Sequence, residues 1–342
     1  MCGFVAISEP GRVFDDLLLA DLAADLKHRG PDSGGLMSET GAALAFRRLA
    51  ILDPATVADQ PMTDPTGRYT IVFNGEIYNY RRLREDLEAV GARFRTKGDT
   101  EVILAAYTVW GENCFARLEG MFAVIIIDRE TNQLIAARDA FGIKPLYLTR
   151  RGKLAAFASE MRPLARLIPI SVDRVSLAEL LVFRFAAGRL SNLAGIESLP
   201  GGTIMVRSLA TGDEHTRRFA DPLATIDPDP SIDMESAIAQ SRDVIIRSVR
   251  DHLASDVGYA VQLSGGVDSS LVSAIAQRET GGTLASYGVR IPDFDQDEAP
   301  YRTQAVKRIG LDHTEITLDE HAFADALPRA VRHMEGPVPH YG

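Results

Sequence analysis

Residues 257–270 read VGYAVQLSGGVDSS, and this stretch decides the fold of the C-terminal part of the chain. Val257–Leu263 is apolar enough for a buried strand. Ser264-Gly265-Gly266 follows as a tight turn, and the residues from Asp268 onward have helical spacing. A strand that passes through a glycine turn into a helix is the first half of a βαβ unit, whose strands are parallel.

The chain on either side of this stretch alternates between helix and strand. Strict alternation is typical of a doubly wound parallel α/β sheet, which we expect over residues 232–342. The expected helices are 234–249, 268–277, 297–309 and one that begins at Glu320, and the expected strands are 257–263, 284–289 and 315–318.

Residues 1–210 have a different pattern, in which short strands are mixed with a few helices. This pattern predicts packed layers of sheet and helix. The strand over 69–73 is expected to end at Asn74-Gly75. Residues 211–231 are polar, contain three prolines and have almost no periodicity, so we expect a linker there. The other expected helices are 15–28, 79–90 and 100–110, and the other expected strands are 122–127, 134–138, 146–148 and 154–158.

The glycine turn after the strand is suited to bind an anion. Gly265 and Gly266 allow the backbone to aim N–H groups at phosphate oxygens. The hydroxyls of Ser264, Ser269 and Ser270 and the N-terminus of the following helix complete the cradle. The lysine of GxxxxGK[ST] is missing, which excludes that phosphate loop. The alternative interpretation is an ordinary turn between strand and helix.

Cys2 follows the initiator methionine and is small enough that removal of the methionine is expected. Its thiol would then lie beside a free α-amine, whose reference pKa of about 7.7–8.0 suits a general base near neutral pH. An N-terminal amine paired with a nucleophile on the same residue is a known catalytic arrangement. The alternative is a chance cysteine. Cys114 belongs to no motif, and we expect it to be a small buried hydrophobic residue.

The composition limits the partners of the chain. Its 342 residues include 37 Lys and Arg and 47 Asp and Glu, a net charge of −10. No basic run favours nucleic acid or a membrane surface. The longest apolar run, Met121–Ile127, is too short to span a bilayer. Two distant cysteines indicate neither a disulfide framework nor a zinc site. We therefore expect a cytoplasmic protein without nucleic-acid or membrane partners, and a homodimer is possible.

Six short motifs follow one another in the N-terminal part: MCGFVAI at 1–7, HRGPD at 28–32, RLAI at 48–51, QPM at 60–62, NGEIYN at 74–79 and GDTE at 98–101. They occur in the order found in class II glutamine amidotransferases, a family that this part resembles. The resemblance implies an Ntn-hydrolase type αββα sandwich in which the cysteine thiolate attacks the side-chain amide of glutamine, forms a thioester and releases ammonia.

This resemblance assigns roles to individual residues. Asn74 and Gly75 would donate hydrogen bonds to the tetrahedral oxyanion, through the amide side chain and a closely approaching backbone N–H. Arg48 would bind the α-carboxylate of glutamine as a bidentate fork, while Glu76 and Asp99 would face the α-ammonium group. By the same resemblance, backbone atoms of Ile51 and Leu52 border glutamine.

Each of these residues also has a simpler interpretation. Asn74-Gly75 alone is typical of a β-turn. Arg48 or Asp99 alone is typical of a solvated surface charge or a helix cap. Arg47 is adjacent to Arg48, and only the register of the motif selects between them.

The sequence SGGVDSS at 264–270 resembles the PP-loop of the ATP pyrophosphatases, which cleave ATP between the α- and β-phosphates and adenylate a substrate. The resemblance implies that the loop binds pyrophosphate and that Asp268 helps to bind Mg²⁺, a hard cation that needs few protein carboxylates. Leu263 and Val289 match positions that flank adenine, although either can equally be a core residue.

A glutaminase followed by a PP-loop domain resembles the glutamine-hydrolysing asparagine synthetases. The sequences DEAPY at 297–301 and HMEGPV at 333–338 fit the synthetase half. The resemblance implies L-aspartate + ATP + L-glutamine + H₂O → L-asparagine + AMP + PPi + L-glutamate, through β-aspartyl-AMP. Glutamine, aspartate and ATP would be the substrates, and ammonia would pass through an internal channel.

The family's SGEGxDE motif is missing, so we expect a C-terminally truncated chain whose glutaminase site is complete and whose synthetase site is incomplete. Two alternatives stay open at this point. One is a related ATP-dependent amidotransferase that aminates another carboxylate. The other is a remnant that binds glutamine or nucleotide without synthetase activity.

Overall fold

The computed structural model describes residues 1–186, 188–292 and 298–336, which form two compact units. The first unit comprises Met1–Ile226 and the second Asp227–Met334. Glu335 and Gly336 group with the first unit, and the carboxylate of Glu335 accepts hydrogen bonds from backbone N–H groups at the start of a short helix of that unit. Asp297, Pro337 and Val338 of the sequence motifs lie outside the described residues.

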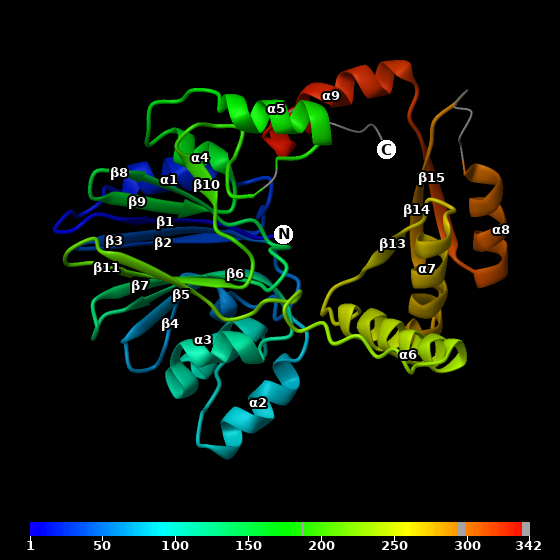
Figure 1. Cartoon of the computed structure of the whole chain (residues 1–342), viewed down its shortest axis with the longest axis horizontal. Coiled ribbons are helices and arrows are strands. Elements are labelled where there is room, and N and C mark those ends of the chain that lie inside the picture. The colour runs from blue at the N-terminus through cyan, green and yellow to red at the C-terminus, as the bar shows by residue number, and fades with distance from the viewer. Residues whose placement is uncertain (187, 293–297, 337–342) are drawn as a thin grey trace. The chain divides into compact units, whose positions relative to one another are not determined.

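Two six-stranded antiparallel sheets are stacked in the first unit (Figure 1). One sheet has the order β10-β8-β9-β1-β3-β2 and the other the order β12-β11-β7-β6-β5-β4. The strands of the first sheet are β1 (Gly3–Ser8), β2 (Ser33–Glu39), β3 (Ala42–Arg48), β8 (Tyr147–Arg151), β9 (Leu154–Ala158) and β10 (Ile196–Ser198). Those of the second are β4 (Met62–Thr63), β5 (Tyr69–Ile77), β6 (Gly120–Asp128), β7 (Gln133–Arg138), β11 (Thr203–Ser208) and β12 (Glu214–Arg218).

Helices cover the outer face of each sheet, which confirms the expected αββα sandwich (Figure 1). The helices α1 and α4 pack on the first sheet, and α2 and α3 pack on the second. The helices of this unit are α1 (Asp16–Ala24), α2 (Tyr80–Ala89), α3 (Asp99–Trp110), α4 (Met161–Ala165) and α5 (Arg174–Phe183), with 3₁₀ turns at Thr56–Ala58 and Gly111–Arg117.

Strand β1 shows why the unit has layers. Phe4 and Ala6 belong to the core between the two sheets, whereas Val5 and Ile7 belong to the core under α1 and α4. Because side chains alternate across a strand, a run that is apolar at every position is buried on both faces. Strand β1 is thus buried between two cores, and because it begins at Gly3, it fixes the position of Cys2.

The linker expected over 211–231 begins too early, because β12 lies within it. Glu214–Arg218 pairs antiparallel with β11 and forms the edge of the second sheet. The boundary between the two units follows Ile226. The sequence EHTRR is polar, as is common in edge strands, which often carry charged side chains. It therefore lacks the apolar alternation by which a strand is predicted.

The second unit contains a parallel sheet of the order β13-β14-β15, as expected. Its core is small, and within the described residues four buried side chains form its centre: Leu263, Ala276, Leu284 and Leu311. A doubly wound sheet requires a reversal of strand order, and the described strands β13, β14 and β15 do not include one. The doubly wound arrangement therefore stays a prediction. The elements are β13 (Ala260–Gln262), β14 (Ala285–Arg290), β15 (Asp312–Thr317), α6 (Met234–His252), α7 (Val267–Thr280), α8 (Ala299–Ile309) and α9 (Glu320–Met334).

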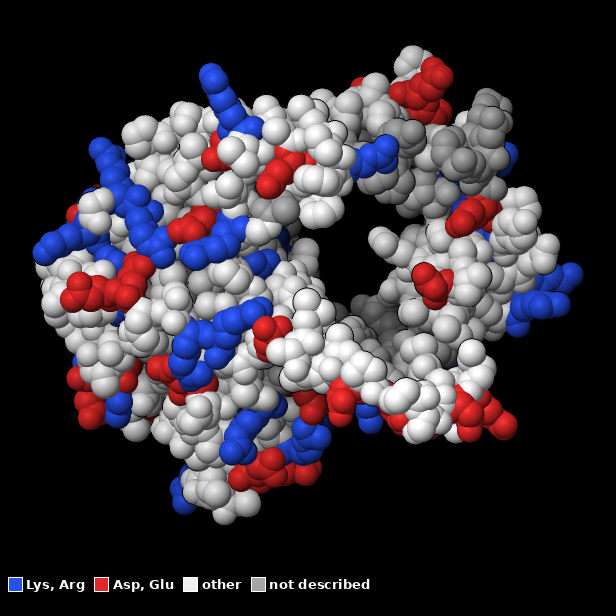
Figure 2. All heavy atoms as spheres, in the orientation of Figure 1, with Lys and Arg blue, Asp and Glu red and all other residues white. Residues whose placement is uncertain are grey.

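The surface carries both signs of charge. Figure 2 shows acidic and basic side chains interspersed over the visible face of the first unit, which has no large region of one sign. Among the described residues, no helix is both long enough and apolar enough to cross a membrane.

Candidate active site

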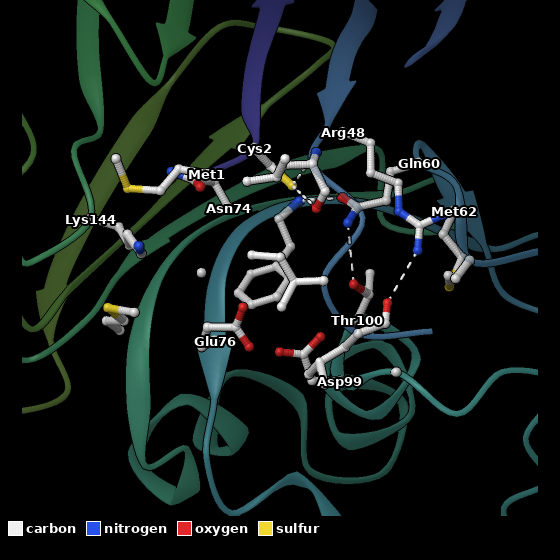
Figure 3. A pocket seen from close by; sticks show the side chains of 18 of the residues that line it. Met1, Cys2, Arg48, Gln60, Met62, Asn74, Glu76, Asp99, Thr100 and Lys144 are labelled. Carbon is white, nitrogen blue, oxygen red and sulfur yellow. Dashed lines mark hydrogen bonds between the residues drawn. The ribbon is translucent and has the colours of Figure 1, made fainter. Parts of the chain in front are cut away.

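A cavity of about 140 Å³ in the first unit brings together the predicted glutaminase residues (Figure 3). Its walls come from the start of the chain, the end of β3 and the segment after it, β5, the N-terminus of α3, the start of β6 and the turn between β7 and β8. The predicted residues that line it are Cys2, Arg48, Ile51, Leu52, Asn74, Gly75, Glu76 and Asp99. Sequence segments far apart in the chain therefore meet in one site.

The thiol of Cys2 is half-buried against the backbone that follows β3. Its Sγ accepts a hydrogen bond from the N–H of Leu49 at 3.4 Å and lies 3.6 Å from the Leu49 carbonyl oxygen, to which the thiol can donate. Burial raises the pKa of the Cys2 thiol, and the Leu49 hydrogen bond and Arg48 oppose that rise. The resting nucleophile is thus a neutral thiol that needs a base.

The base expected from the sequence is the N-terminal amine. In the full chain this amine belongs to Met1, which lines the same cavity as Cys2. Burial lowers the pKa of the amine, and the cations Arg29 and Lys144 lower it further. A lowered pKa keeps an amine in its free-base form near neutral pH, which is what a general base requires. Removal of Met1 would transfer this role to the α-amine of Cys2.

Asn74 presents an unsatisfied donor to the cavity. Its side chain is 1% exposed, and its Nδ2 has no hydrogen-bond partner within the described part of the chain. An unpaired buried amide is costly, so such a group usually has a function. On β5, Asn74 lies two residues after Val72, which faces the core between the sheets, and Cys2 packs against that same core. The amide and the thiol therefore occupy the same side of the sheet.

The sequence predicted that the strand ends at Asn74-Gly75, and this prediction is wrong. Strand β5 continues to Ile77, and Asn74 and Gly75 pair with Ala123 and Phe122 of β6. Glycine is required because a Cβ at position 75 would lie 2.1 Å from the carbonyl oxygen of Met121. Close packing of the two strands has overridden the turn preference of an Asn-Gly pair.

The backbone N–H of Gly75 faces the edge of β5 that borders the cavity. The N–H groups of Phe73 and Ile77 leave this edge to bond side chains, namely Gln60 Oε1 at 2.6 Å and Asp99 Oδ2 at 3.0 Å. Because strand N–H groups alternate in direction, that of Gly75 points the same way, between these two acceptors. Asn74 and Gly75 can thus offer two donors to one oxyanion.

Arg48 is buried at the end of β3, and its guanidinium group already has several partners. One terminal nitrogen donates to Asp59 at 2.7 Å and to the carbonyl of Ala55 at 2.9 Å. The other donates to the carbonyls of Leu52 at 3.2 Å and Asp53 at 2.6 Å. Four of the five N–H donors of the guanidinium therefore hold the segment after β3. A substrate carboxylate would have to displace some of these partners, so the bidentate role stays a prediction.

Glu76 and Asp99 are two carboxyl groups on one side of the cavity. Burial, and then the charge of Asp99, raise the pKa of Glu76 to about 8. Burial raises the pKa of Asp99 to about 6, although the backbone N–H of Ile77 opposes the rise. Both carboxyl groups therefore favour their protonated forms more than a solvated carboxyl group does, and a substrate ammonium group would favour the ionised forms.

Gln60 and Lys144 are among the cavity residues that had no role in the sequence analysis. Gln60 is clamped between Phe73 and Thr100, because its Nε2 donates to the Thr100 hydroxyl at 3.2 Å. Gln60 belongs to the QPM motif at 60–62, and this motif could have identified it as a site residue. Lys144 lines the cavity from the turn between β7 and β8, and no motif identified it.

Cys114 is fully buried and burial raises its pKa, which confirms the expectation of a buried hydrophobic residue.

The predicted PP-loop lies between β13 and α7 in the second unit. Gly265 adopts a φ of +109°, and a Cβ there would lie 2.7 Å from the carbonyl oxygen of Glu298. The Ser264 hydroxyl accepts a hydrogen bond from the N–H of Gly266 at 3.1 Å and is bonded to the Ser269 hydroxyl at 3.0 Å. The turn is thus already formed at the N-terminus of a helix, where anions bind.

Arg302 of α8 donates a hydrogen bond to the first residue of this loop. Its side chain is 2% exposed and donates to the carbonyl of Ser264 at 3.0 Å and to Glu315 at 2.9 Å. Sequence analysis missed this residue, because the pattern of α8 predicts only a helix. A buried arginine paired with a carboxylate fixes the loop through one carbonyl group.

The residues around the loop fit a magnesium ion that is bound mainly by phosphates. No group of three or more His, Cys, Asp or Glu in the described part of the chain can hold a metal alone. Asp268 stands exposed in the first turn of α7, and the carboxylate of Glu298 lies 3.5 Å from where a Cβ on Gly266 would be. Mg²⁺ commonly binds one or two carboxylates together with phosphates and water.

The two residues predicted to flank adenine differ in burial. Leu263 belongs to the small core of the second unit, whereas Val289 is about half exposed on the neighbouring strand β14. Ser270 completes the predicted set in the first turns of α7. Contact of these residues with a nucleotide stays a prediction.

Comparison with known proteins gives two matches to family models. Residues 1–220 match a glutamine amidotransferase domain, and residues 240–341 match asparagine synthase. The chain is 32% identical over 344 residues to asparagine synthetase [glutamine-hydrolyzing] 1 of Bacillus subtilis, which covers 99% of this chain and 53% of that protein. It is 32% identical over 329 residues to a putative asparagine synthetase [glutamine-hydrolyzing] of Mycobacterium tuberculosis, covering 92% and 50%.

The chain spans about half the length of the curated relatives it matches. One similar solved structure is titled the allosteric regulatory enzyme of purine biosynthesis, with a TM-score of 0.50 and 14% identity. That match covers 92% of this chain and 80% of the other. At this identity the likeness concerns the fold alone.

Proposed function

Because the chain belongs to the glutamine amidotransferase family, we propose that it hydrolyses glutamine to glutamate and ammonia at Cys2. One observation carries the proposal: the Cys2 thiol, the unsatisfied Asn74 amide and the acidic pair Glu76 and Asp99 meet in one cavity. A nucleophile, an oxyanion donor and an ammonium site are the three parts that hydrolysis of an amino-acid amide needs.

The first chemical step is attack by Cys2 on the side-chain carbonyl carbon of glutamine. The α-amine of Cys2 accepts the thiol proton as the C–S bond forms. The negative charge that develops on the carbonyl oxygen is stabilised by Asn74 Nδ2 and by the backbone N–H of Gly75. The amine then returns the proton to the departing nitrogen, ammonia leaves, and a thioester remains. Water hydrolyses the thioester to glutamate and restores the thiol.

The acidic pair orients the substrate in this proposal. Glu76 and Asp99 bind the α-ammonium of glutamine, and Arg48 binds the α-carboxylate after exchanging some of its backbone partners. Ile51 and Leu52 border the substrate. Because both ends of the amino acid are bound, the amide carbon is held at the thiol, which lowers the entropic cost of the reaction.

We propose further that the ammonia is used to make asparagine from aspartate and ATP, as the names of the relatives and the match over residues 240–341 suggest. Aspartate would be adenylated, and ammonia would displace AMP from β-aspartyl-AMP. The PP-loop would bind pyrophosphate through Ser264, Gly265, Gly266, Ser269 and Ser270, and Leu263 and Val289 would flank adenine. Mg²⁺, bound by Asp268 and phosphates, would neutralise charge on the leaving pyrophosphate. A cytoplasmic location and a homodimer are part of this proposal.

The test is glutamate and ammonia release from glutamine by chain whose N-terminal methionine has been removed, as verified by mass spectrometry. Cys2→Ala should abolish release, because no other thiol lines the cavity in the described part of the chain. Cys114→Ser is the matched control and should retain activity, because Cys114 lies in the core of the first unit. Absence of release by folded, processed wild-type chain would refute the glutaminase proposal.

The synthetase proposal needs separate measurements. Wild-type chain is incubated with aspartate, MgATP and either glutamine or ammonium chloride, and asparagine and AMP are quantified together. Equal amounts of both products would support the proposal. Glutamine hydrolysis without AMP formation would restrict the activity of this chain to the glutaminase.

A further inference from the structure

Lys144 is a charged group of the cavity that the proposed mechanism does not use. Its side chain is 6% exposed, yet it lines the same cavity as Cys2. Figure 3 shows Lys144 beside Met1, at the end of the cavity away from Arg48 and Asp99. A lysine is rarely buried to this extent unless it is paired with groups of opposite charge.

The backbone of Lys144 is fixed on both sides. The carboxylate of Asp139, which is fully buried, accepts hydrogen bonds from the N–H groups of Phe141 at 3.1 Å, Ile143 at 2.9 Å and Lys144 at 3.0 Å. Arg138 donates to the carbonyl of Lys144 at 2.7 Å. The turn between β7 and β8 is therefore a rigid support, and it directs the side chain into the cavity.

Charged groups from several elements face the Lys144 ammonium group. They are Glu76 on β5, the Cys2 thiol and the N-terminal amine at the start of the chain, Arg29 in the segment before β2, and Asp139 of its own turn. Burial lowers the pKa of Lys144, while the carboxyl groups of Glu76 and Asp139 favour its charged form when they are ionised. The cation thus lies within electrostatic range of the Cys2 thiol and of the Met1 amine, and removal of Met1 would place the new α-amine on Cys2 itself.

We propose that Lys144 is a positioning residue that lowers the proton affinity of the Cys2 thiol and of the N-terminal amine. This inference rests on the proposed glutaminase function. A nearby cation repels the proton on an amine and stabilises a thiolate. Lys144 therefore keeps the base free of protons and makes the thiol easier to deprotonate, without touching the substrate.

The sign of the effect is fixed by this electrostatics. Loss of the Lys144 charge raises the pKa of the thiol and of the amine, so reaction at Cys2 shifts to higher pH. We expect a shift of about one pH unit, which slows the reaction at pH 7 about tenfold. Lys144→Arg keeps a cation in place and should restore much of the wild-type profile.

The experiment measures the rate of Cys2 alkylation by iodoacetamide against pH, read by mass spectrometry of the N-terminal peptide in methionine-processed protein. The variants are Lys144→Met, Lys144→Gln and Lys144→Arg. Lys153→Met is the matched control, because Lys153 is exposed and does not line the cavity. Cys114 reports folding in every sample, because a buried thiol resists alkylation.

A profile displaced to higher pH in the Met and Gln variants, and restored in the Arg variant, supports the proposal. Superimposable profiles for wild type and either folded neutral variant would overturn it. Alkylation requires no glutamine, so the outcome is independent of turnover. The wild type could release no ammonia while the Lys144→Met and Lys144→Gln profiles are still displaced from the wild-type profile. That result would refute the proposed glutamine hydrolysis and support the role of Lys144.

Discussion

The two units of the chain position their candidate sites by different means. In the first unit, apolar clusters fill the space between the sheets and under the helices on both outer faces. In the described part of the second unit, α6 and α9 bury no residue, and the core has four buried side chains with a few partly buried ones packed against them. The cavity around Cys2 therefore rests on packed layers, whereas the PP-loop depends on a few polar contacts.

Exposed apolar side chains mark the same difference. Met234, Ile238 and Ile245 of α6, together with Leu271 of α7, line an open apolar groove in the second unit. A packed core contributes most of the stability of a domain, and exposed apolar surface contributes none. We therefore expect the second unit to be the less stable one.

The largest effect is expected at the oxyanion site. Asn74→Ala removes an unsatisfied donor and should reduce kcat for glutamine hydrolysis by about 10²–10³-fold, the usual effect of losing one oxyanion donor. The KM for glutamine should change little, because the donor acts on the transition state. Steady-state kinetics measure both constants. A variant with unchanged kcat would show that Asn74 is not an oxyanion donor.

A core substitution should separate the units by stability. Ile125→Ala, in the core between the sheets, should cost about 2–5 kcal/mol of the free energy of unfolding. Trp110 is the single tryptophan and packs on the core of the first unit, so its fluorescence reports that unit. Guanidinium titrations followed by Trp110 fluorescence measure the change.

The same titration followed by far-UV circular dichroism should show an additional transition at lower denaturant, in which the second unit unfolds. Leu311→Ala should move only this earlier transition, because Leu311 belongs to the small core. Coincident transitions by the two probes in wild type would contradict the separation of the units.

Nucleotide binding at the PP-loop should weaken when the buried Arg302 is replaced. Arg302→Met removes the donor to Ser264 and should weaken MgATP binding about tenfold, because a charge-assisted hydrogen bond contributes about 1.5–3 kcal/mol. Isothermal titration with MgATP measures the affinity. Arg308→Met, on the exposed side of the same helix, is the control and should bind like wild type. Glutamine hydrolysis should be unaffected in both variants.

The smallest effect is a pH dependence of glutamine binding. Glu76, with a pKa of about 8 in the free cavity, is mostly protonated at pH 7 and must ionise to bind an ammonium group. Affinity should therefore rise several-fold from pH 7 to pH 8 and fall as pH decreases, with proton release on binding. Calorimetry of Cys2→Ala with glutamine, in buffers of different ionisation enthalpy, measures both. In Glu76→Gln the pH dependence should be weaker, and an unchanged dependence would exclude Glu76 as the titrating group.

Local patterns were sufficient to predict the main elements. Helix α3 was expected to end at Trp110 and does so, because Gly111 follows with a φ of +57° and ends the helix. The glycine turn between β13 and α7 was also placed correctly, although β13 is shorter than expected. These features depend on residues that are neighbours in the chain.

Features that depend on distant residues were missed. The continuation of β5 through Asn74-Gly75 depends on close packing against Met121, and the partners of Arg48 depend on the path of the segment that follows β3. Lys144 enters the cavity because Asp139 organises its turn. No periodicity in the sequence encodes such contacts, so the composition of the cavity was predicted only where a motif carried it.

The path of β5 also bears on the chemical ageing of the protein. In flexible chain segments, the backbone nitrogen that follows an asparagine attacks its side-chain amide, and a succinimide forms that opens to aspartate or isoaspartate. An Asn-Gly pair is the most susceptible one. Asn74-Gly75 is held extended against β6, which keeps that nitrogen away from the amide. Each excursion to the unfolded state removes this protection, and deamidation would then place a negative charge where the oxyanion has to form.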